Sequence, residues 1–144
     1  MRAWIALLRA HATASRLLST SLEAEHGLTL NDYEALRVLA EAEGRRLKRV
    51  DLARRLVLTP SGVTRLLEGL EAAGLVERAS CDSDLRVTYA QLTDAGATRL
   101  EAASCGHLGS VRALLESSLT DDDIDHLAEL LERLSSPVRL AVPR

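Results

Sequence analysis

The stretch from residue 48 to residue 92 constrains the fold of this 144-residue chain more than any other. A short helical segment at residues 50–56 is followed by a tight turn and by a second helix with its own start and stop signals. Thr59 can cap the N-terminus of that second helix, and Pro60 suits its first position, where a missing N–H costs nothing. Gly74 follows the last apolar residue, as a C-terminal glycine does. The stretch therefore predicts two helices joined by a tight turn.

The second of these helices has an apolar face and a polar face. Four apolar residues recur at i, i+3, i+4 and i+7 and predict the buried side: Val63, Leu66, Leu67 and Leu70. The opposite side carries small or hydrogen-bonding groups: Ser61, Thr64, Arg65 and Glu68. A recognition helix presents such groups at its N-terminal end to base edges in the major groove of DNA. We therefore predict DNA contacts from this helix and from the end of the helix before it: Thr59, Pro60, Ser61, Gly62, Thr64, Arg65, Arg54 and Arg55.

Two short strands and a polar turn follow the second helix. The strands are predicted at residues 75–78 and 86–92, and the turn between them at residues 79–85. Two helices joined by a tight turn and followed by a hairpin make a winged helix-turn-helix, a fold that is mostly α with a small β-hairpin wing. Within the wing we predict that Asp84 orients Arg86, whose guanidinium enters a minor groove or holds a phosphate.

These motifs together resemble one known family. Similarity to the MarR family of bacterial transcriptional regulators is carried by the run LTPSGVTRLLEGLEAAGLVERASCDSDLRVTYAQLTDAG, residues 58–96. The matching parts are residues 58–61, the pair Thr64-Arg65, and residues 70–78, 84–86 and 92–96. One departure lies in the wing, which has only Arg78 and Arg86 as cations, whereas the family's wing is often more basic. The resemblance implies a sequence-specific DNA-binding regulator: a ligand-responsive repressor that binds a pseudo-palindromic operator in double-stranded DNA as a homodimer.

The rest of the chain is predicted to be mostly helical. Its expected elements are a helix at residues 4–22, a helix capped by Thr29 or Asn31 and ending at residues 43–44, a short strand at 45–48 that pairs with the wing, a helix at 93–117 capped by Thr93, and a helix that starts at 119–123 and stops at 135–137. The helices at the two ends carry more apolar surface than a small winged helix can cover, which implies a partner. We predict one domain over residues 1–144, with a DNA-binding lobe at 30–92 and dimerisation helices at 1–25 and 93–144.

A site for a small effector is implied by the resemblance alone. Many members of the family release DNA when a small aromatic acid binds between the DNA-binding lobe and the dimer helices. Carried over by position, this cleft would involve four residues: Trp4, Arg9, His11 and Tyr33. The competing interpretation is that Trp4 and His11 belong to a dimer core. No cofactor is expected.

The charge is unevenly divided along the chain. The whole sequence has a net charge of −3, but residues 45–92 contain nine Lys or Arg against six Asp or Glu, a balance of +3, which leaves −6 for the remainder. A basic module beside an acidic remainder is expected when only one part of a protein contacts phosphates. The competing interpretation of Arg54, Arg55 and Arg65 is that they are simply solvated.

Several other classes of protein are disfavoured by the sequence. It has no apolar run of membrane-spanning length and no signal-peptide pattern, so we expect a cytoplasmic protein without a membrane partner. Motifs typical of enzymes are absent, and neither the four histidines nor Cys81 and Cys105 have metal-ligand spacing. Two alternatives stay open: a winged helix that contacts only proteins, and a thiol-redox-responsive regulator that uses Cys81.

Overall fold

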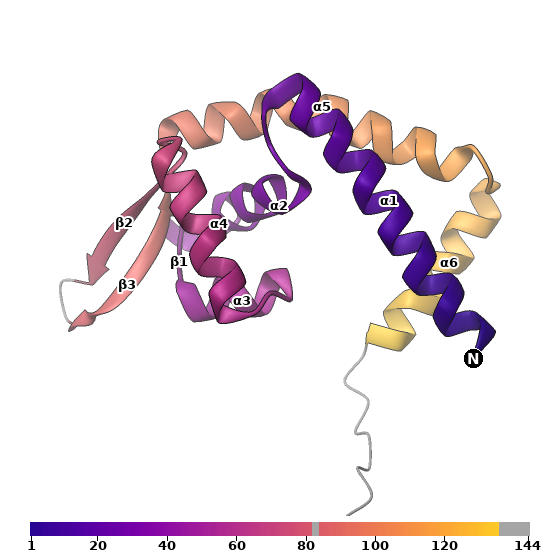
Figure 1. The fold of residues 1–144 in the computed structure, drawn as a ribbon, viewed down its shortest axis with the longest axis horizontal. Helices are drawn as coiled ribbons and strands as arrows, with labels where there is room; N and C mark the ends of the chain where they lie inside the picture. Colours follow the sequence, from indigo (N-terminus) through magenta and orange to yellow (C-terminus); the bar gives the residue numbers. More distant parts are fainter. Residues whose placement is uncertain (82–83, 136–144) are drawn as a thin grey trace, which may run out of the picture. The chain divides into compact units, whose positions relative to one another are not determined.

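The structure, a computed structural model, describes residues 1–81 and 84–135, without side-chain detail for residue 81 and residues 84–87. The chain divides into two compact units, Met1–Leu108 and Gly109–Arg144, and the boundary falls inside the fifth helix. Both units are dominated by helices, and the first also holds a three-stranded antiparallel sheet (Figure 1). The expectation of a mostly α winged helix-turn-helix with a small hairpin is confirmed.

The first unit contains every predicted element of the DNA-binding lobe. In chain order it consists of α1 (Arg2–His26), α2 (Leu30–Ala40), the 3-10 helix η1 (Glu43–Arg45), β1 (Arg46–Lys48), α3 (Arg49–Leu56), α4 (Pro60–Ala72), β2 (Val76–Cys81), β3 (Asp84–Leu92) and the larger part of α5 (Asp94–Glu116). Of the two caps considered for α2, Thr29 is the one used: its hydroxyl accepts from the backbone N–H of Asp32, whose carboxylate in turn accepts from the N–H of Thr29. The short strand before α3 pairs with the wing, as predicted.

The strands of the wing are longer than predicted. The turn expected at residues 79–85 was wrong in extent, because β2 reaches residue 81 and β3 starts at residue 84. Ala79 lies opposite Tyr89 and Ser80 opposite Thr88, so backbone pairing continues through a segment whose side chains are mostly polar. The register is irregular between Ser80 and Cys81, since Ser80 lies opposite Thr88 but Cys81 lies opposite Asp84. The order of strands in the sheet is β1-β3-β2.

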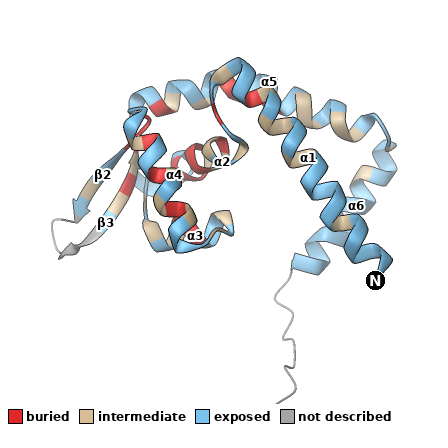
Figure 2. Cartoon of the chain, viewed as in Figure 1, coloured by how far each residue is buried: buried red, intermediate tan, exposed pale blue. Residues whose placement is uncertain are grey.

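One hydrophobic core holds the first unit together. Its most fully buried large side chains are Leu22, Leu28, Leu36, Leu39, Leu52, Val63 and Leu67. Figure 2 shows the buried positions gathering on α2, α3 and α4. The apolar face predicted for α4 is confirmed, since Val63, Leu67 and Leu70 are buried and Leu66 packs partly against the same core. This core fixes the orientation of α4 and therefore the face that α4 shows to solvent.

The second unit exposes its apolar residues. It contains the end of α5 and α6 (Asp121–Ser135), whose start is capped by Thr120 and Asp123 in a reciprocal pair of hydrogen bonds. None of the described residues of this unit, 109–135, is buried. Its leucine stripe is open to solvent, with Leu127 exposed by 37% and Leu134 by 61%. Within the described residues, no helix has the length and apolar character needed to cross a membrane.

Candidate nucleic-acid interface

The turn between α3 and α4 is tight and strained. Val57 ends α3 in the left-handed conformation, with φ of 54° and ψ of 39°, and the N–H of Leu58 then donates to the carbonyl of Ala53 at 3.0 Å. A β-branched residue seldom adopts this conformation, and the cost is about 1–2 kcal/mol. The core contacts of α3 and α4 hold the turn in place. The result is a helix-turn-helix in which α3 and α4 pack against each other (Figure 1).

Both ends of α4 are fixed by local hydrogen bonds. Thr59 caps the start, with its hydroxyl accepting from the N–H of Gly62 at 3.1 Å, and Pro60 occupies the first position. At the other end Gly74 adopts φ of 71°, and the N–H groups of Gly74 and Leu75 donate to the carbonyls of Glu71 and Leu70. This pair of bonds is a Schellman motif, which satisfies the last carbonyls of a helix. The predicted cap, proline and terminal glycine are therefore all confirmed.

Thr64 is held in place by a partner that the sequence did not reveal. Its hydroxyl donates to the carbonyl of Pro60 at 2.9 Å and accepts from Nη2 of Arg49 at 3.1 Å. The side chain is half-buried, and its one hydroxyl proton is already in use. Arg49, at the first position of α3, thus joins the candidate interface. No local motif indicates this contact, because Arg49 and Thr64 lie on different helices and are 15 residues apart.

Three other predicted DNA contacts of α3 and α4 are exposed to solvent: Ser61, Arg65 and Arg54. Ser61 and Arg65 are exposed on α4, and Ser61 shares a hydrogen bond of 3.2 Å with the capping hydroxyl of Thr59. Arg54 is exposed on α3, with a loose ion pair of 3.5 Å to Asp51. Arg65 and Arg54 can therefore reach a polyanion with little loss of protein contacts.

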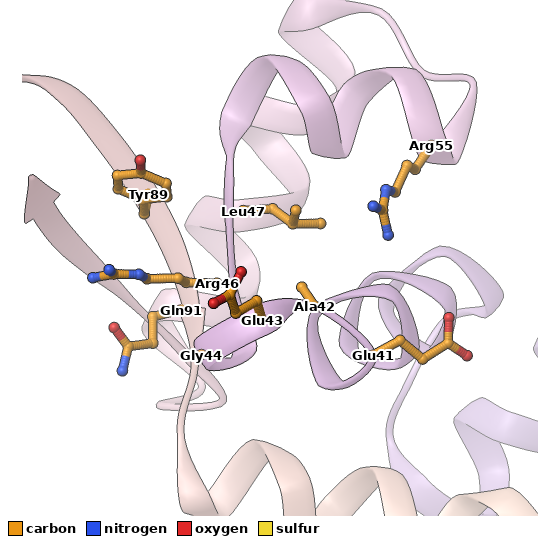
Figure 3. Close-up of a pocket in the computed structure, with 9 residues that line it drawn as sticks. All are labelled: Glu41, Ala42, Glu43, Gly44, Arg46, Leu47, Arg55, Tyr89 and Gln91. Carbon is orange, nitrogen blue, oxygen red and sulfur yellow. The ribbon is translucent and has the colours of Figure 1, made fainter.

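Arg55 points into a cavity away from the start of α4. This cavity, of about 880 Å³, is bordered by the end of α2, η1, β1, α3 and β3, and Figure 3 shows the Arg55 guanidinium directed into it. Carboxylates share the space, since Glu41 and Glu43 also line it, and Glu41 is paired with Arg37 at 2.7 Å. The second cation of the cavity, Arg46, lies with its guanidinium carbon 5.1 Å from the centre of the Tyr89 ring. The mixed charge of this cavity does not favour a purely anionic ligand.

One of the wing's two cations is held by α4. Nε of Arg78 donates to both carboxylate oxygens of Glu71, at 3.0 and 2.9 Å. The hydrogen bond to Glu71, with its negative charge and that of Glu68, raises the pKa of Arg78 above its ordinary value. The pair ties the base of the wing to the C-terminal half of α4. The side chains of Asp84 and Arg86, the predicted contacts of the wing, lie outside the described residues, as does that of Cys81.

The four predicted effector residues do not line one cavity. Trp4 and Arg9 are exposed on α1, whereas Tyr33 is buried in the core and donates from its hydroxyl to Ser104 at 3.3 Å. Only His11 lines the cavity of about 560 Å³ between α1, α2 and the α3–α4 turn. Its other lining residues are Ser15, Ser19, Thr29, Leu30, Asn31, Glu34, Leu56, Val57 and Leu58. The positions carried over from the family resemblance did not distinguish the exposed Trp4 from the buried Tyr33.

A buried histidine lies beside Tyr33. His107 on α5 is 8% exposed, its ring centre is 4.3 Å from that of Tyr33, and its Nδ1 has no hydrogen-bond partner. Burial lowers the pKa of His107 below the ordinary value, against the opposing charge of Glu34. In the described part of the chain, no group of three or more His, Cys, Asp or Glu residues is arranged to hold a metal ion.

Comparison with known proteins identifies the family. The sequence profile of the MarR family matches residues 26–86. The repressor YetL of Bacillus subtilis is 34% identical over 116 residues, which are 78% of this chain and 69% of the repressor. The chain belongs to the MarR family of DNA-binding transcriptional regulators.

Solved MarR-family structures share the fold over nearly the whole chain. AbsC of Streptomyces coelicolor matches with a TM-score of 0.82 and 32% identity, over 92% of this chain and 89% of AbsC. Sco3205 of the same organism, solved in complex with DNA, matches with a TM-score of 0.87 and 29% identity, over 96% of this chain and 87% of Sco3205. The MarR fold therefore extends through the helices on both sides of the helix-turn-helix.

Proposed function

We propose that this MarR-family chain is a repressor that binds a pseudo-palindromic operator, with α4 in the major groove and the wing against the adjacent minor groove. The observation that carries the proposal is the start of α4: a rigidly capped helix end that exposes Ser61 and Arg65 and lies beside the cations Arg49 and Arg54. A helix N-terminus with exposed cations nearby favours a phosphate backbone electrostatically. The DNA complex of Sco3205 supports the same use of this lobe.

The proposed DNA-binding form is a homodimer. We assign the DNA-binding lobe to residues 30–92 and the pairing surfaces to residues 1–25 and 93–144. Exposed apolar side chains on α1 and α6 support this assignment: Trp4, Ile5, Leu8, Leu17, Leu127, Leu130, Leu131 and Leu134. Apolar stripes of this kind are stabilised when a second surface covers them. Two lobes joined in this way would read two half-sites, which matches a pseudo-palindromic operator.

The proposed effector is a small aromatic acid that binds in the cavity of about 560 Å³ between α1, α2 and the α3–α4 turn. Its volume is within the range of small-molecule sites, and His11 together with Ser15 and Ser19 supplies polar groups. The cavity is also lined by the carboxylate of Glu34, whose charge is offset by its ion pair with Arg37 at 2.7 Å. Leu56, Val57 and Leu58 form one wall, so an occupant would press on the turn that precedes α4. Binding at this wall would shift the population away from the DNA-competent dimer.

The central test is DNA binding by the full chain carrying Arg65→Ala, measured on the DNA upstream of the protein's own gene over a range of salt concentrations. We expect affinity to fall by about 1–3 kcal/mol if Arg65 reads a base, or the salt slope to fall by about one unit if it holds a phosphate. Arg37→Ala is the control, because Arg37 lies on α2, outside both the predicted DNA contacts and the proposed pairing surfaces, and is paired with Glu34 and Glu41. Unchanged affinity and unchanged salt slope in Arg65→Ala would contradict the proposed role of α4.

A further inference from the structure

An apolar groove crosses the surface formed by α3 and the start of α4. Two adjoining hollows, of about 220 and 490 Å³, share the side chains of Val50, Ala53 and Pro60. Val57 borders the second hollow. Val50, Ala53 and Val57 fall at i, i+3 and i+7 of the chain, so they lie along one side of α3 and its terminal turn. These four residues define the α3–α4 groove.

The α3–α4 groove exposes large apolar side chains to solvent on the surface that is proposed to contact DNA. Val50 is 55% exposed and Val57 is 88% exposed. Two guanidiniums border the groove, those of Arg49 and Arg54, and no carboxylate is among the residues that line either hollow. An apolar floor with a cationic rim fits a ligand that is anionic on its outside and has apolar groups at defined positions. Duplex DNA seen from its major groove has this chemistry.

Only one apolar group stands on the major-groove edge of unmodified base pairs. It is the C5-methyl of thymine, which side chains such as Ala and the methyl of Thr contact in direct readout. Pro60 is the first residue of α4, so the α3–α4 groove adjoins the end of α4 that is proposed to enter the major groove. We infer that the α3–α4 groove receives the C5-methyl of a thymine and selects A·T pairs at that position of the operator. This inference rests on the proposed DNA-binding function.

The inference can be tested by removing a single methyl group from the DNA. A duplex is first isolated by the full chain from a random library, and each of its thymines is then replaced in turn by deoxyuridine, which pairs identically but lacks the methyl. At one or more positions in each half-site we expect affinity to fall about fourfold, the effect of returning one methyl-sized group to water. The measurement is fluorescence anisotropy at a fixed salt concentration.

Substitution of the protein then connects the methyl to the α3–α4 groove. In Val50→Ser the parent duplex and its deoxyuridine counterpart should bind equally well, because the apolar contact is already lost. Ala73→Ser is the matched control, an exposed residue at the far end of α4, and should keep the fourfold difference. Thermal unfolding of Val50→Ser checks that the exposed substitution leaves the fold intact.

The outcomes separate this inference from the proposed function. The inference is overturned if wild-type protein binds every deoxyuridine duplex as tightly as the parent duplex, or if Val50→Ser keeps the fourfold difference in affinity. In either case, salt-dependent binding of the parent duplex still supports the proposed DNA-binding function. If no duplex is retained from the library at any salt concentration, the proposed function fails and the inference fails with it.

Discussion

Gly96 should be the least replaceable glycine in the described chain, because it lies where α5 passes closest to the start of the wing. A Cβ on residue 96 would overlap the carbonyl oxygen of Leu75 and lie 2.7 Å from Cδ1 of Leu92. The Leu75 carbonyl is backbone and already accepts from the N–H of Thr93 at 3.1 Å, so it cannot rotate away. Overpacking costs about 1–3 kcal/mol, and an overlap with fixed backbone belongs at the upper end of that range, whereas alanine inside a helix recovers at most about 1 kcal/mol relative to glycine. Gly96→Ala should therefore lower the free energy of unfolding by about 2 kcal/mol.

Urea unfolding followed by circular dichroism, at one fixed protein concentration, measures this change. With a slope of about 2 kcal/mol per molar urea, the midpoint should fall by roughly 1 M. Gly69→Ala is the control, because a Cβ on Gly69 would meet nothing within 4 Å and α4 gains helix propensity there. Its midpoint should rise slightly. If Gly96→Ala unfolds at the wild-type urea concentration or above, the close approach of α5 to Leu75 is not as described.

Two further predictions concern charges. The pKa of His107 is lowered in the folded chain, so at a pH below the ordinary value of about 6.5 the unfolded chain binds the proton more readily than the folded chain does. The free energy of unfolding should therefore decrease as the pH falls below 6.5, by up to about 1.4 kcal/mol per pH unit. His107→Phe should make this pH dependence weaker. An equally steep profile in that variant would assign the effect to other groups. Glu71→Gln should release Arg78 for phosphate contact and steepen the salt dependence of DNA binding by about one unit. An unchanged slope in anisotropy titrations would mean that Arg78 does not reach the DNA.

Local signals account for most of what the sequence predicted. The caps at Thr59 and Thr93 and the glycine after α4 were found because each depends on residues within one helical turn. The extent of the wing was missed because strand length depends on a partner strand, and pairing tolerates polar side chains at an exposed ladder.

Contacts between elements were the part of the candidate site that the sequence could not give. The Arg49–Thr64 bond joins the starts of two helices, and the Glu71–Arg78 pair joins a helix to a strand; neither follows a periodicity that a single sequence displays. Tyr33 is the instructive case. The family resemblance placed it in a ligand cleft, but it belongs to the apolar positions of α2 and is buried in the core, where its hydroxyl donates to Ser104.

One hydroxyl group connects the end of α4, the proposed recognition helix, to α5. Oγ1 of Thr93 donates to the carbonyl of Gly74, just beyond the end of α4, at 2.8 Å and accepts from the N–H of Gly96 at 3.0 Å. The close approach of Gly96 to Leu75 holds the same junction from its other side. Because the end of α4 and the start of α5 are both held at this junction, we expect a displacement of the start of α5 to move α4 as well. In the proposed dimer, the proposed effector would then change the spacing of the two copies of α4 without distorting either helix, which is a low-cost way to move between binding and non-binding states.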